Sequence, residues 1–283
     1  MSHLARSIRH SPALATVTTT SLCAGTAFAA TNELEEIVVT AQKQEQKLSE
    51  TPLSVTALSS TDLKALAATQ FRDFANTVPG LGFTSEGVGS TQINLRGITS
   101  GGSVSPTVGI YVDEVPYGSS TAFAGAAQLA LDVGLFDLNR VEVLRGPQGT
   151  LYGASTMGGL LKYVTTAPDL QKFGGKARAG LSATDDGDIN YDVASAVNLP
   201  FGSDKAAARL SGFYSHDGGY VDSVGLGEED VNQSDVYGGR ADLLLQPTDA
   251  LSIRLNAFMQ RIDRDGTSQV AYDLATGNPL DGD

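Results

Sequence analysis

A glycine-rich block between residues 140 and 166 constrains the fold of this chain more than any other segment. Its two ends, Val141–Leu144 and Leu160–Thr166, are apolar runs typical of strands. The turn region between them contains five glycines, which are Gly146, Gly149, Gly153, Gly158 and Gly159. Pro147 disfavours a helix just before it, and glycines permit positive φ angles and close backbone approach. The block therefore predicts a tightly folded loop between two strands, with Arg145 at the end of the first.

The spacing of this block leaves two alternatives to weigh. An ordinary segment rich in β-turns fits the spacing equally well. Phosphate binding does not fit, because GPQGTLYG lacks the GxGxxG spacing and Lys176 is followed by Ala177 instead of Ser or Thr. The formal net charge of −13 also argues against a nucleic-acid partner.

The first 29 residues have the pattern of a secretory signal peptide. A start with two arginines and no acid precedes a small, apolar stretch. Ala27 and Ala29 satisfy the small-x-small cleavage rule, so we expect the processed chain to begin at Ala30. The single cysteine, Cys23, lies in this segment, so no disulfide, thiol catalysis or cysteine metal site is expected afterwards. A disordered Ala/Thr tail is the alternative.

Residues 30–50 are polar and charged apart from one apolar island. The island consists of Glu36, Ile37, Val38, Val39, Thr40 and Ala41. Its β-branched residues favour an extended backbone. The flanks cannot bury a core, so we expect a flexible segment. A short strand on a flexible tether is suited to adding onto the edge of another protein's sheet.

Residues 51–170 predict one α/β domain. The expected strands and helices are a strand at Leu53–Leu58, helices at about Thr61–Ala68 and Phe71–Thr77, strands at Ile93–Arg96 and Val108–Val112, a helix at Ala122–Leu131, and the two strands of the glycine-rich block. Ser59 and Asp62 have the spacing of a weak capping box before the first helix.

Residues 171–283 change to the alternating pattern of antiparallel strands. The expected strands are Ala177–Ala183, Ile189–Leu199, Ala207–Ser215, Asp235–Leu245 and Leu251–Met259. Alternation fits both a transmembrane barrel with a wet lumen and a soluble sheet with one buried face. The connections favour the barrel, because short turns at Pro200–Lys205 and Pro247–Ala250 alternate with longer polar loops.

The sequence offers no catalytic, cofactor or metal site. His216 is the one histidine after residue 29, and a catalytic triad or a histidine metal site needs partners that we do not find. The acids between Asp185 and Asp192 miss the EF-hand pattern, because Tyr191 stands where glycine belongs and Val197 where glutamate belongs. We expect His216 to be a lone surface or interface histidine and the acids to lie in a wet loop.

Four motifs, in order, resemble the plug domain of TonB-dependent outer-membrane receptors: INLRG, VGIYVDEVPYG, RVEVLRGPQGTLYG and GGLLKYVTT. The resemblance implies an α+β plug domain followed by the first antiparallel strands of a transmembrane β-barrel. It identifies the apolar island as a TonB box, which reaches the energy transducer TonB in the periplasm. Family barrels close at about 22 strands, whereas residues 171–283 supply about five. We therefore expect an N-terminal fragment or a truncated gene product.

The same resemblance implies a receptor and active transporter of the outer membrane, and not an enzyme. Its expected partners are TonB, outer-membrane lipids and a scarce nutrient such as an iron-siderophore complex. It implies that Arg96 and Arg145 face barrel glutamates and help to hold the plug. Loop position alone selects six ligand-facing candidates, which are Thr84, Ser85, Ser100, Ser103, Tyr117 and Ser119. The alternative function is a soluble periplasmic or secreted β-rich binding protein.

Overall fold

The computed structural model describes residues 37–100, 105–118, 134–185, 187–202, 204–223, 227–267 and 275–276. These residues belong to one unit of the chain, Glu36–Asp283. Several expectations lie outside them: the cleavage site at Ala27, Ala29 and Ala30, Glu36 of the island, the loop residues Ser103 and Ser119, and the helix Ala122–Leu131. The domain limits expected at residues 29, 50 and 170 stay predictions.

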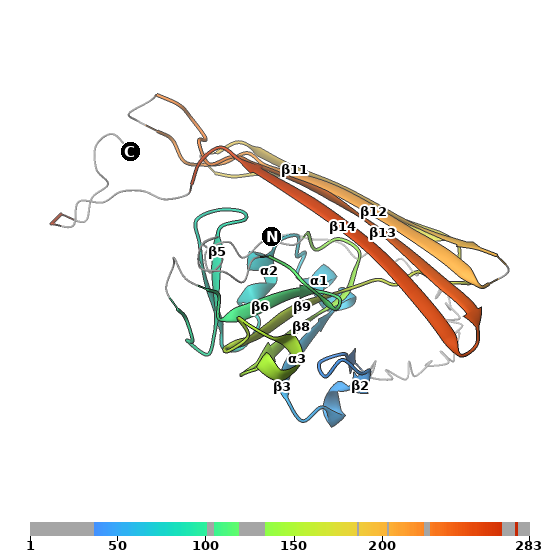
Figure 1. The fold of residues 1–283 in the computed structure, drawn as a ribbon. Coiled ribbons are helices and arrows are strands. Elements are labelled where there is room, and N and C mark those ends of the chain that lie inside the picture. Colours follow the sequence, from blue (N-terminus) through green and yellow to red (C-terminus); the bar gives the residue numbers. More distant parts are fainter. Residues whose placement is uncertain are drawn as a thin grey trace, which may run out of the picture. The chain divides into compact units, whose positions relative to one another are not determined.

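A mixed five-stranded sheet is the centre of the α/β part, residues 37–166 (Figure 1). Its strands in spatial order are β3 (Ser54–Ser59), β8 (Leu138–Arg145), β9 (Gly159–Thr165), β6 (Val108–Val112) and β7 (Val115–Pro116). β6 and β9 run parallel, and the other neighbours run antiparallel. This sheet therefore contains the predicted strands at Leu53–Leu58 and Val108–Val112 and the two predicted strands that flank the glycine-rich block.

The glycine-rich block forms the tight connection between β8 and β9 that the sequence predicts. Gly146, Gly153 and Gly159 have φ angles of 100°, 74° and 148°. A β-carbon at Gly159 would lie 2.2 Å from the carbonyl oxygen of Leu144, so only glycine fits there. The sequence did not predict the short helix α3 (Gly149–Tyr152) inside this connection.

Two short helices and a hairpin complete the α/β part. They are α1 (Ser60–Ala65), α2 (Phe71–Ala75), β4 (Leu81–Ser85) and β5 (Thr91–Leu95). The predicted capping box is present, with Ser59 and Asp62 bonded in both directions. α1 ends earlier than predicted, because Ala67 adopts a positive φ of 51°. Phe71 is buried in the apolar core that these elements share with one face of the sheet. No helix in the described part of the chain is long and apolar enough to cross a membrane.

The opposite face of the sheet carries the apolar island. Residues 37–50 fold back onto it as β1 (Val38–Val39), β2 (Gln46–Lys47) and the turn η1 (Leu48–Glu50). Val39 and Ala41 are 0% and 1% exposed, and they share a second apolar core with Leu144 and Leu160. The sequence predicts a flexible tether here, whereas the structure docks these residues. Composition misses the docking because the surface that receives the island lies about 100 residues further along the chain.

A second sheet, which we call the wall, has five antiparallel strands in chain order. They are β10 (Gly174–Ala183), β11 (Ile189–Phe201), β12 (Ala206–Asp217), β13 (Ser234–Thr248) and β14 (Leu251–Arg264). All five predicted strands are present, and each is longer than predicted. The sequence predicts turns at Pro200 and Pro247, but both prolines lie inside strands, and a register shift between Leu245 and Thr248 accommodates the second.

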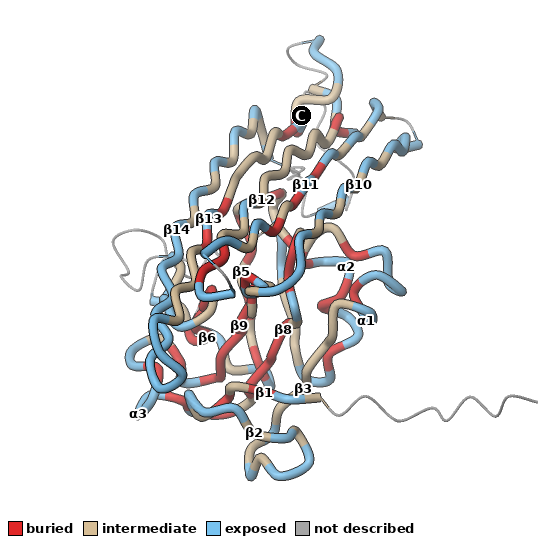
Figure 2. The backbone as a smooth tube through the Cα atoms, turned by 90° about the vertical axis from the view of Figure 1, so that its right-hand side faces the viewer, coloured by how far each residue is buried: buried red, intermediate tan, exposed pale blue. Residues whose placement is uncertain are grey.

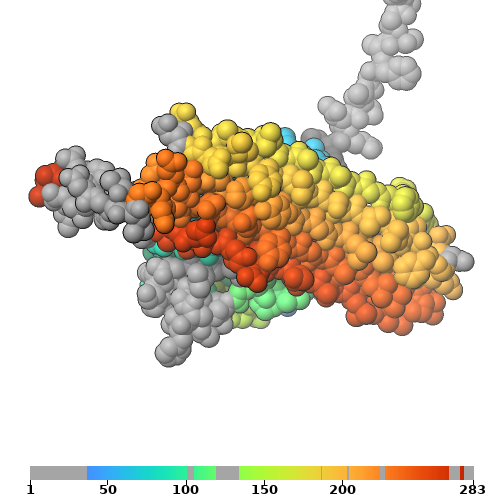
Figure 3. Space-filling model, turned by 90° about the horizontal axis from the view of Figure 1, so that it is seen from above, coloured from blue at the N-terminus to red at the C-terminus, as the bar shows by residue number. Residues whose placement is uncertain are grey.

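The two faces of the wall have opposite character. On β11, Ile189, Val193 and Leu199 are 52%, 51% and 38% exposed, while the alternate residues Ala194 and Asn198 are buried. β10 alternates between half-buried and exposed positions up to Leu181, and β14 does so from Phe258 to Arg264, whereas β12 and β13 alternate less regularly (Figure 2). Figure 3 shows the wall strands side by side from yellow to red. A soluble sheet buries its apolar face. An exposed apolar face with a polar inner face is instead the arrangement of a membrane barrel.

Candidate functional site

The N-terminal segment, residues 37–41, covers a polar site on an otherwise apolar face of the first sheet. β8 and β9 place Glu142 and Lys162 opposite each other in register, and both side chains are buried. Arg140 precedes Glu142 by two residues on β8 and donates to it from Nε at 2.7 Å. Tyr152 of α3 completes the site. We call Arg140, Glu142, Tyr152 and Lys162 the docking site.

Thr40 is the polar centre of the docked segment. Its backbone N–H donates to Glu142 Oε1 at 2.9 Å, and its hydroxyl lies 3.3 Å from the same oxygen. Lys162 Nζ donates to this hydroxyl at 2.9 Å and to the Thr40 carbonyl oxygen at 3.3 Å. The hydroxyl therefore stands between a buried acceptor and a buried donor.

Tyr152 holds the backbone of the segment. Its hydroxyl donates to the carbonyl oxygens of Thr40 at 3.2 Å and Ala41 at 3.0 Å. Burial, followed by the charges of Glu114 and Glu142, raises the pKa of Tyr152 well above its ordinary value. The hydroxyl therefore keeps its proton and acts as a donor to the segment.

The docking site does not pair all of its polar atoms. Lys162 pairs with Glu114, whose side chain is 51% exposed. Glu142 is fully buried, and its Oε2 has no hydrogen-bond partner among the described residues. A buried carboxylate oxygen without a partner raises the free energy of the state that buries it. Burial of this oxygen therefore offsets part of the stabilisation that the contacts of the docked segment provide.

A second charge cluster joins the α/β part to the wall. Asp137, just before β8, has a fully buried carboxylate. It pairs with Arg209 at 2.6 Å, Arg240 at 2.7 Å and Lys176 at 2.9 Å. Cations from β12, β13 and β10 thus converge on one carboxylate of the α/β part. Both Asp137 oxygens accept hydrogen bonds, Oδ1 from Arg209 and Oδ2 from Arg209 and Arg240.

The cluster continues along the wall and returns to the α/β part at a second point. Asp242 lies between Arg240 at 3.2 Å and Arg254 at 3.0 Å. Arg254 Nη2 donates to Thr165 Oγ1 at 2.7 Å, and this hydroxyl donates to Asp113 Oδ2 at 2.6 Å. We call Asp113, Asp137, Asp242 and their cationic partners the wall anchor.

The pKa of Asp137 favours its charged form. Burial alone raises the pKa of this carboxyl, but hydrogen bonds from Arg209 and Lys176 and the charge of Arg240 outweigh it. The pKa of Asp137 therefore lies below its ordinary value. Asp137 and Asp113 also adopt positive φ angles of 62° and 53°, which their contacts with neighbours hold in place.

The two arginines singled out by the sequence lie at the C-terminal ends of β5 and β8, which belong to different sheets. Arg145 Nη1 donates to the carbonyl oxygen of Pro79 at 3.0 Å. Arg96 follows β5 with a φ of 54°, and its backbone N–H donates to the Gly80 carbonyl oxygen at 2.7 Å. Contact of either side chain with glutamates of a barrel stays a prediction.

The described loop candidates lie at separate places. Thr84 and Ser85 are exposed on β4, and the Ser100 hydroxyl donates to the Ser105 carbonyl oxygen at 2.6 Å. Tyr117 meets Phe258 of β14 edge-on, with ring centroids 5.5 Å apart. A role of these residues in ligand binding stays a prediction.

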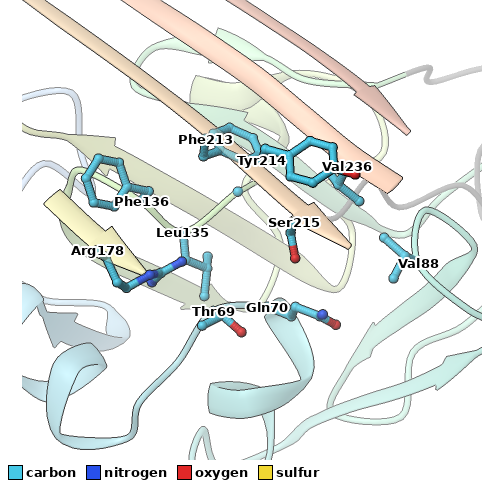
Figure 4. A pocket seen from close by; sticks show the side chains of 11 residues that line it. Thr69, Gln70, Val88, Leu135, Phe136, Arg178, Phe213, Tyr214, Ser215 and Val236 are labelled. Atoms are coloured by element: carbon cyan, nitrogen blue, oxygen red, sulfur yellow. The ribbon is translucent and has the colours of Figure 1, made fainter. Parts of the chain in front are cut away.

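Hollows separate α2 and its neighbours from the wall. One has a volume of about 440 Å³, and its lining includes Arg72, Asp73, Ser85, Asp217 and Tyr220. A smaller cavity of about 40 Å³ lies between Thr69 and Gln70 on one side and Phe213 and Tyr214 of β12 on the other (Figure 4). A β-carbon at Gly134 would lie 2.4 Å from the Phe213 ring, so the wall touches the backbone there.

His216, for which the sequence predicts a lone surface or interface histidine, is partly buried and contacts Asp235 and Tyr191. Its Nδ1 lies 2.9 Å from Asp235 Oδ1, and its ring stacks on Tyr191 with centroids 4.8 Å apart. Among the described residues, no group of three or more His, Cys, Asp or Glu side chains could hold a metal ion.

The fold and these two clusters define a class of protein. An α/β part is fastened by buried ion pairs to the polar face of strands whose other face is apolar and exposed. This is the arrangement of a plug seated against the wall of an outer-membrane barrel. The chain therefore has the construction of an outer-membrane receptor with a plug.

Comparisons with known proteins assign the family. Residues 47–160 match the TonB-dependent Receptor Plug Domain. The chain is 30% identical over 230 residues to the pesticin receptor of Yersinia pestis, covering 79% of this chain and 32% of that protein. It is 29% identical over 167 residues to the vitamin B12 transporter BtuB of Vibrio vulnificus, covering 58% and 26%. The chain thus spans about a third or less of the length of these relatives.

Solved structures agree with this assignment. The ferric yersiniabactin uptake receptor FyuA of Yersinia pestis matches with a TM-score of 0.63 and 26% identity, over 75% of this chain and 32% of that one. The ferripyoverdine receptor of the outer membrane of Pseudomonas aeruginosa matches with a TM-score of 0.68 over 87% and 31%, and at 18% identity this shows the fold alone. The chain carries the plug domain of the TonB-dependent outer-membrane receptors. Its place is the outer membrane, and its family consists of receptors and transporters rather than enzymes.

The sequence did not predict the residues that form the two clusters. Glu142 and Lys162 each stand as a single charge inside an apolar strand, in VEVLR and LLKYV. Such charges are almost never fully buried unless they are paired, so their register on neighbouring strands was a usable signal. Asp137 carried no comparable signal, because its partners lie 39 to 103 residues away along the chain.

Proposed function

We propose that this chain serves TonB-dependent uptake of a scarce nutrient, such as an iron-siderophore complex, across the outer membrane. Ligand binds from outside to the plug and the strand loops, and the N-terminal segment is then released to TonB in the periplasm. The observation that carries the proposal is the docked segment itself. It is a short strand already extended, held on the plug by a site in which one buried carboxylate oxygen has no hydrogen-bond partner among the residues described.

The relatives support a small, scarce ligand without naming one for this chain. Their names cover pesticin, ferric yersiniabactin, ferripyoverdine and vitamin B12. An iron chelate is the proposal because two of these four names concern ferric complexes. The soluble alternative loses support from the exposed apolar face of the wall, which a soluble binding protein would bury.

The test is an uptake experiment on the receptor in its own outer membrane. The probes are radiolabelled ferric yersiniabactin, ferripyoverdine and vitamin B12. Val39→Pro removes a backbone donor and restricts the preceding residue, whereas Val39→Ile keeps both backbone and shape. We expect the proline variant to lose energised uptake of the accepted probe and to keep its binding at the cell surface. The isoleucine variant keeps both.

A strain without TonB provides the control. It should show the same phenotype as Val39→Pro, and the mutation should cause no further loss there. Normal uptake by the proline variant would mean that the segment is only a tether, and the energy-coupling proposal would then fail.

A further inference from the structure

The docking site binds the side chain of Thr40 from two sides with groups of opposite hydrogen-bonding capacity. Glu142 Oε1, which only accepts, lies 3.3 Å from the hydroxyl. Lys162 Nζ, which only donates, lies 2.9 Å from it. A hydroxyl satisfies both neighbours at once, because it donates one hydrogen and accepts through its lone pairs.

The two neighbours have few alternatives while the segment is docked. Lys162 retains Glu114 and the Thr40 carbonyl oxygen, and Glu142 retains Arg140 and the Thr40 N–H. Glu142 Oε2 already has no partner in the described part of the chain. Loss of the hydroxyl would therefore remove one hydrogen bond each from Lys162 and Glu142, and a longer one from Arg140 at 3.4 Å, in a site that is already incompletely paired. Once the segment leaves, water reaches both charged groups and their cost disappears.

We propose that the Thr40 hydroxyl sets the equilibrium between the docked and released states of the N-terminal segment, so that Thr40 determines how much of the segment TonB can reach before ligand binds. The second half of this statement rests on the proposed function. The first half concerns this chain alone. Thr40 acts here as a positioning residue, because it holds the strand formed by Val38 and Val39 without being part of it.

Two substitutions separate the hydroxyl from the shape of the side chain. Thr40→Val keeps the β-branched shape and removes the hydroxyl, and Thr40→Ser keeps the hydroxyl and removes a methyl group. Thr51→Val is a matched control, because the Thr51 hydroxyl bonds the exposed carbonyl oxygen of Lys47 outside the docking site. Lys162→Met removes the donor instead of the hydroxyl.

The measurement is the mobility of a nitroxide spin label at Val38→Cys in unliganded receptor without TonB. Cys23, the one cysteine in this sequence, precedes the expected cleavage site, so residues 30–283 bring no competing thiol. We expect Thr40→Val to raise the ratio of mobile to immobile label about tenfold, as the loss of hydrogen bonding to buried charges implies. Thr40→Ser and Thr51→Val should stay close to the parent. The Thr40→Val/Lys162→Met double variant should show less than the sum of the two single effects, because both changes remove the bond between the Thr40 hydroxyl and Lys162 Nζ.

Hydrogen exchange over residues 138–145 establishes that each variant keeps the plug folded. Equal label mobility in Thr40→Val and the parent would overturn the proposal, and so would additive effects in the double variant. A second arm measures binding of the soluble C-terminal domain of TonB to the unliganded receptors, where Thr40→Val should bind more tightly by the same factor. Failure of every variant and the parent to bind TonB would contradict the proposed function, while the label result would still decide the role of Thr40.

Discussion

The wall anchor and the docking site are both built from buried charges, but they differ in how fully their carboxylate oxygens are hydrogen-bonded. Asp137 has three cationic partners within 2.6–2.9 Å and both of its oxygens are bonded. Glu142 has one arginine and an oxygen without a partner in the described residues. Breaking a fully paired buried cluster is costly, whereas a partly paired one gains hydration on opening. The difference indicates that the plug is fastened to the wall and that the N-terminal segment is held for release.

The largest effect should follow from removing the centre of the wall anchor. Asp137→Ala leaves Arg209 and Arg240 buried without their carboxylate, and we expect a loss of about 3–5 kcal/mol in the free energy of separating plug and wall. Hydrogen exchange of the β8 and β9 amides in the membrane-embedded receptor measures this loss. Asp263→Ala is the control, because its pair with Arg261 is exposed and should contribute under about 1 kcal/mol. Similar effects of both substitutions would remove the distinction between the anchor and an ordinary surface pair.

Acidification should weaken the wall anchor, as the Asp137→Ala substitution does, because it removes the charge of Asp137. The pKa of Asp137 is lowered, so its contribution is complete above the ordinary value of 3.8 and is lost as the pH falls through the folded-state pKa. In the parent, we expect the protection of the β8 amides from hydrogen exchange to fall as the pH drops below 3.8. In Asp137→Asn, this protection should depend less on pH. The same pH profile in both proteins would contradict the assignment of this titration to Asp137.

A smaller effect should follow from loosening the docking site. Tyr152→Phe removes the hydroxyl that donates to the carbonyl oxygens of Thr40 and Ala41. We expect docking of the segment to weaken by about 1 kcal/mol, with no change in the protection of the wall strands. Proteolysis of residues 37–50 reports the first quantity. Tyr220→Phe, at a half-exposed position on the wall side, serves as the control and should leave that proteolysis unchanged.

The smallest effects should come from Arg96 and Arg145. Replacing either with alanine should speed hydrogen exchange across residues 140–166 and leave surface expression intact. Arg145 loses its solvent-exposed bond to the Pro79 carbonyl oxygen, a contribution of about 0.5 kcal/mol. Unchanged exchange and uptake in both variants would favour arginines that are merely solvated, and would leave the wall anchor as the main attachment of the plug.

Local patterns in the sequence predicted the elements well, because those patterns act over a few residues. The alternation on β11 predicted its start and its two faces, and the Ser59–Asp62 spacing predicted the start of α1. The docked segment and the wall anchor depend on contacts between distant parts of the chain. Thr40 meets Glu142 across 102 residues, and Arg240 meets Asp137 across 103. No periodicity links such positions, so composition predicted a free tether where the structure places a docked strand.

The order of opening tests the central claim most directly. Hydrogen exchange of the membrane-embedded receptor, resolved to residues 37–41 and 138–145, measures the opening of the segment and of β8 in the same sample. The account predicts that the segment opens alone, at least about tenfold more often than β8, because local openings span a range of free energies below that of global unfolding. Exchange of the segment only when β8 also exchanges would contradict it, because plug and segment would then be one cooperative unit.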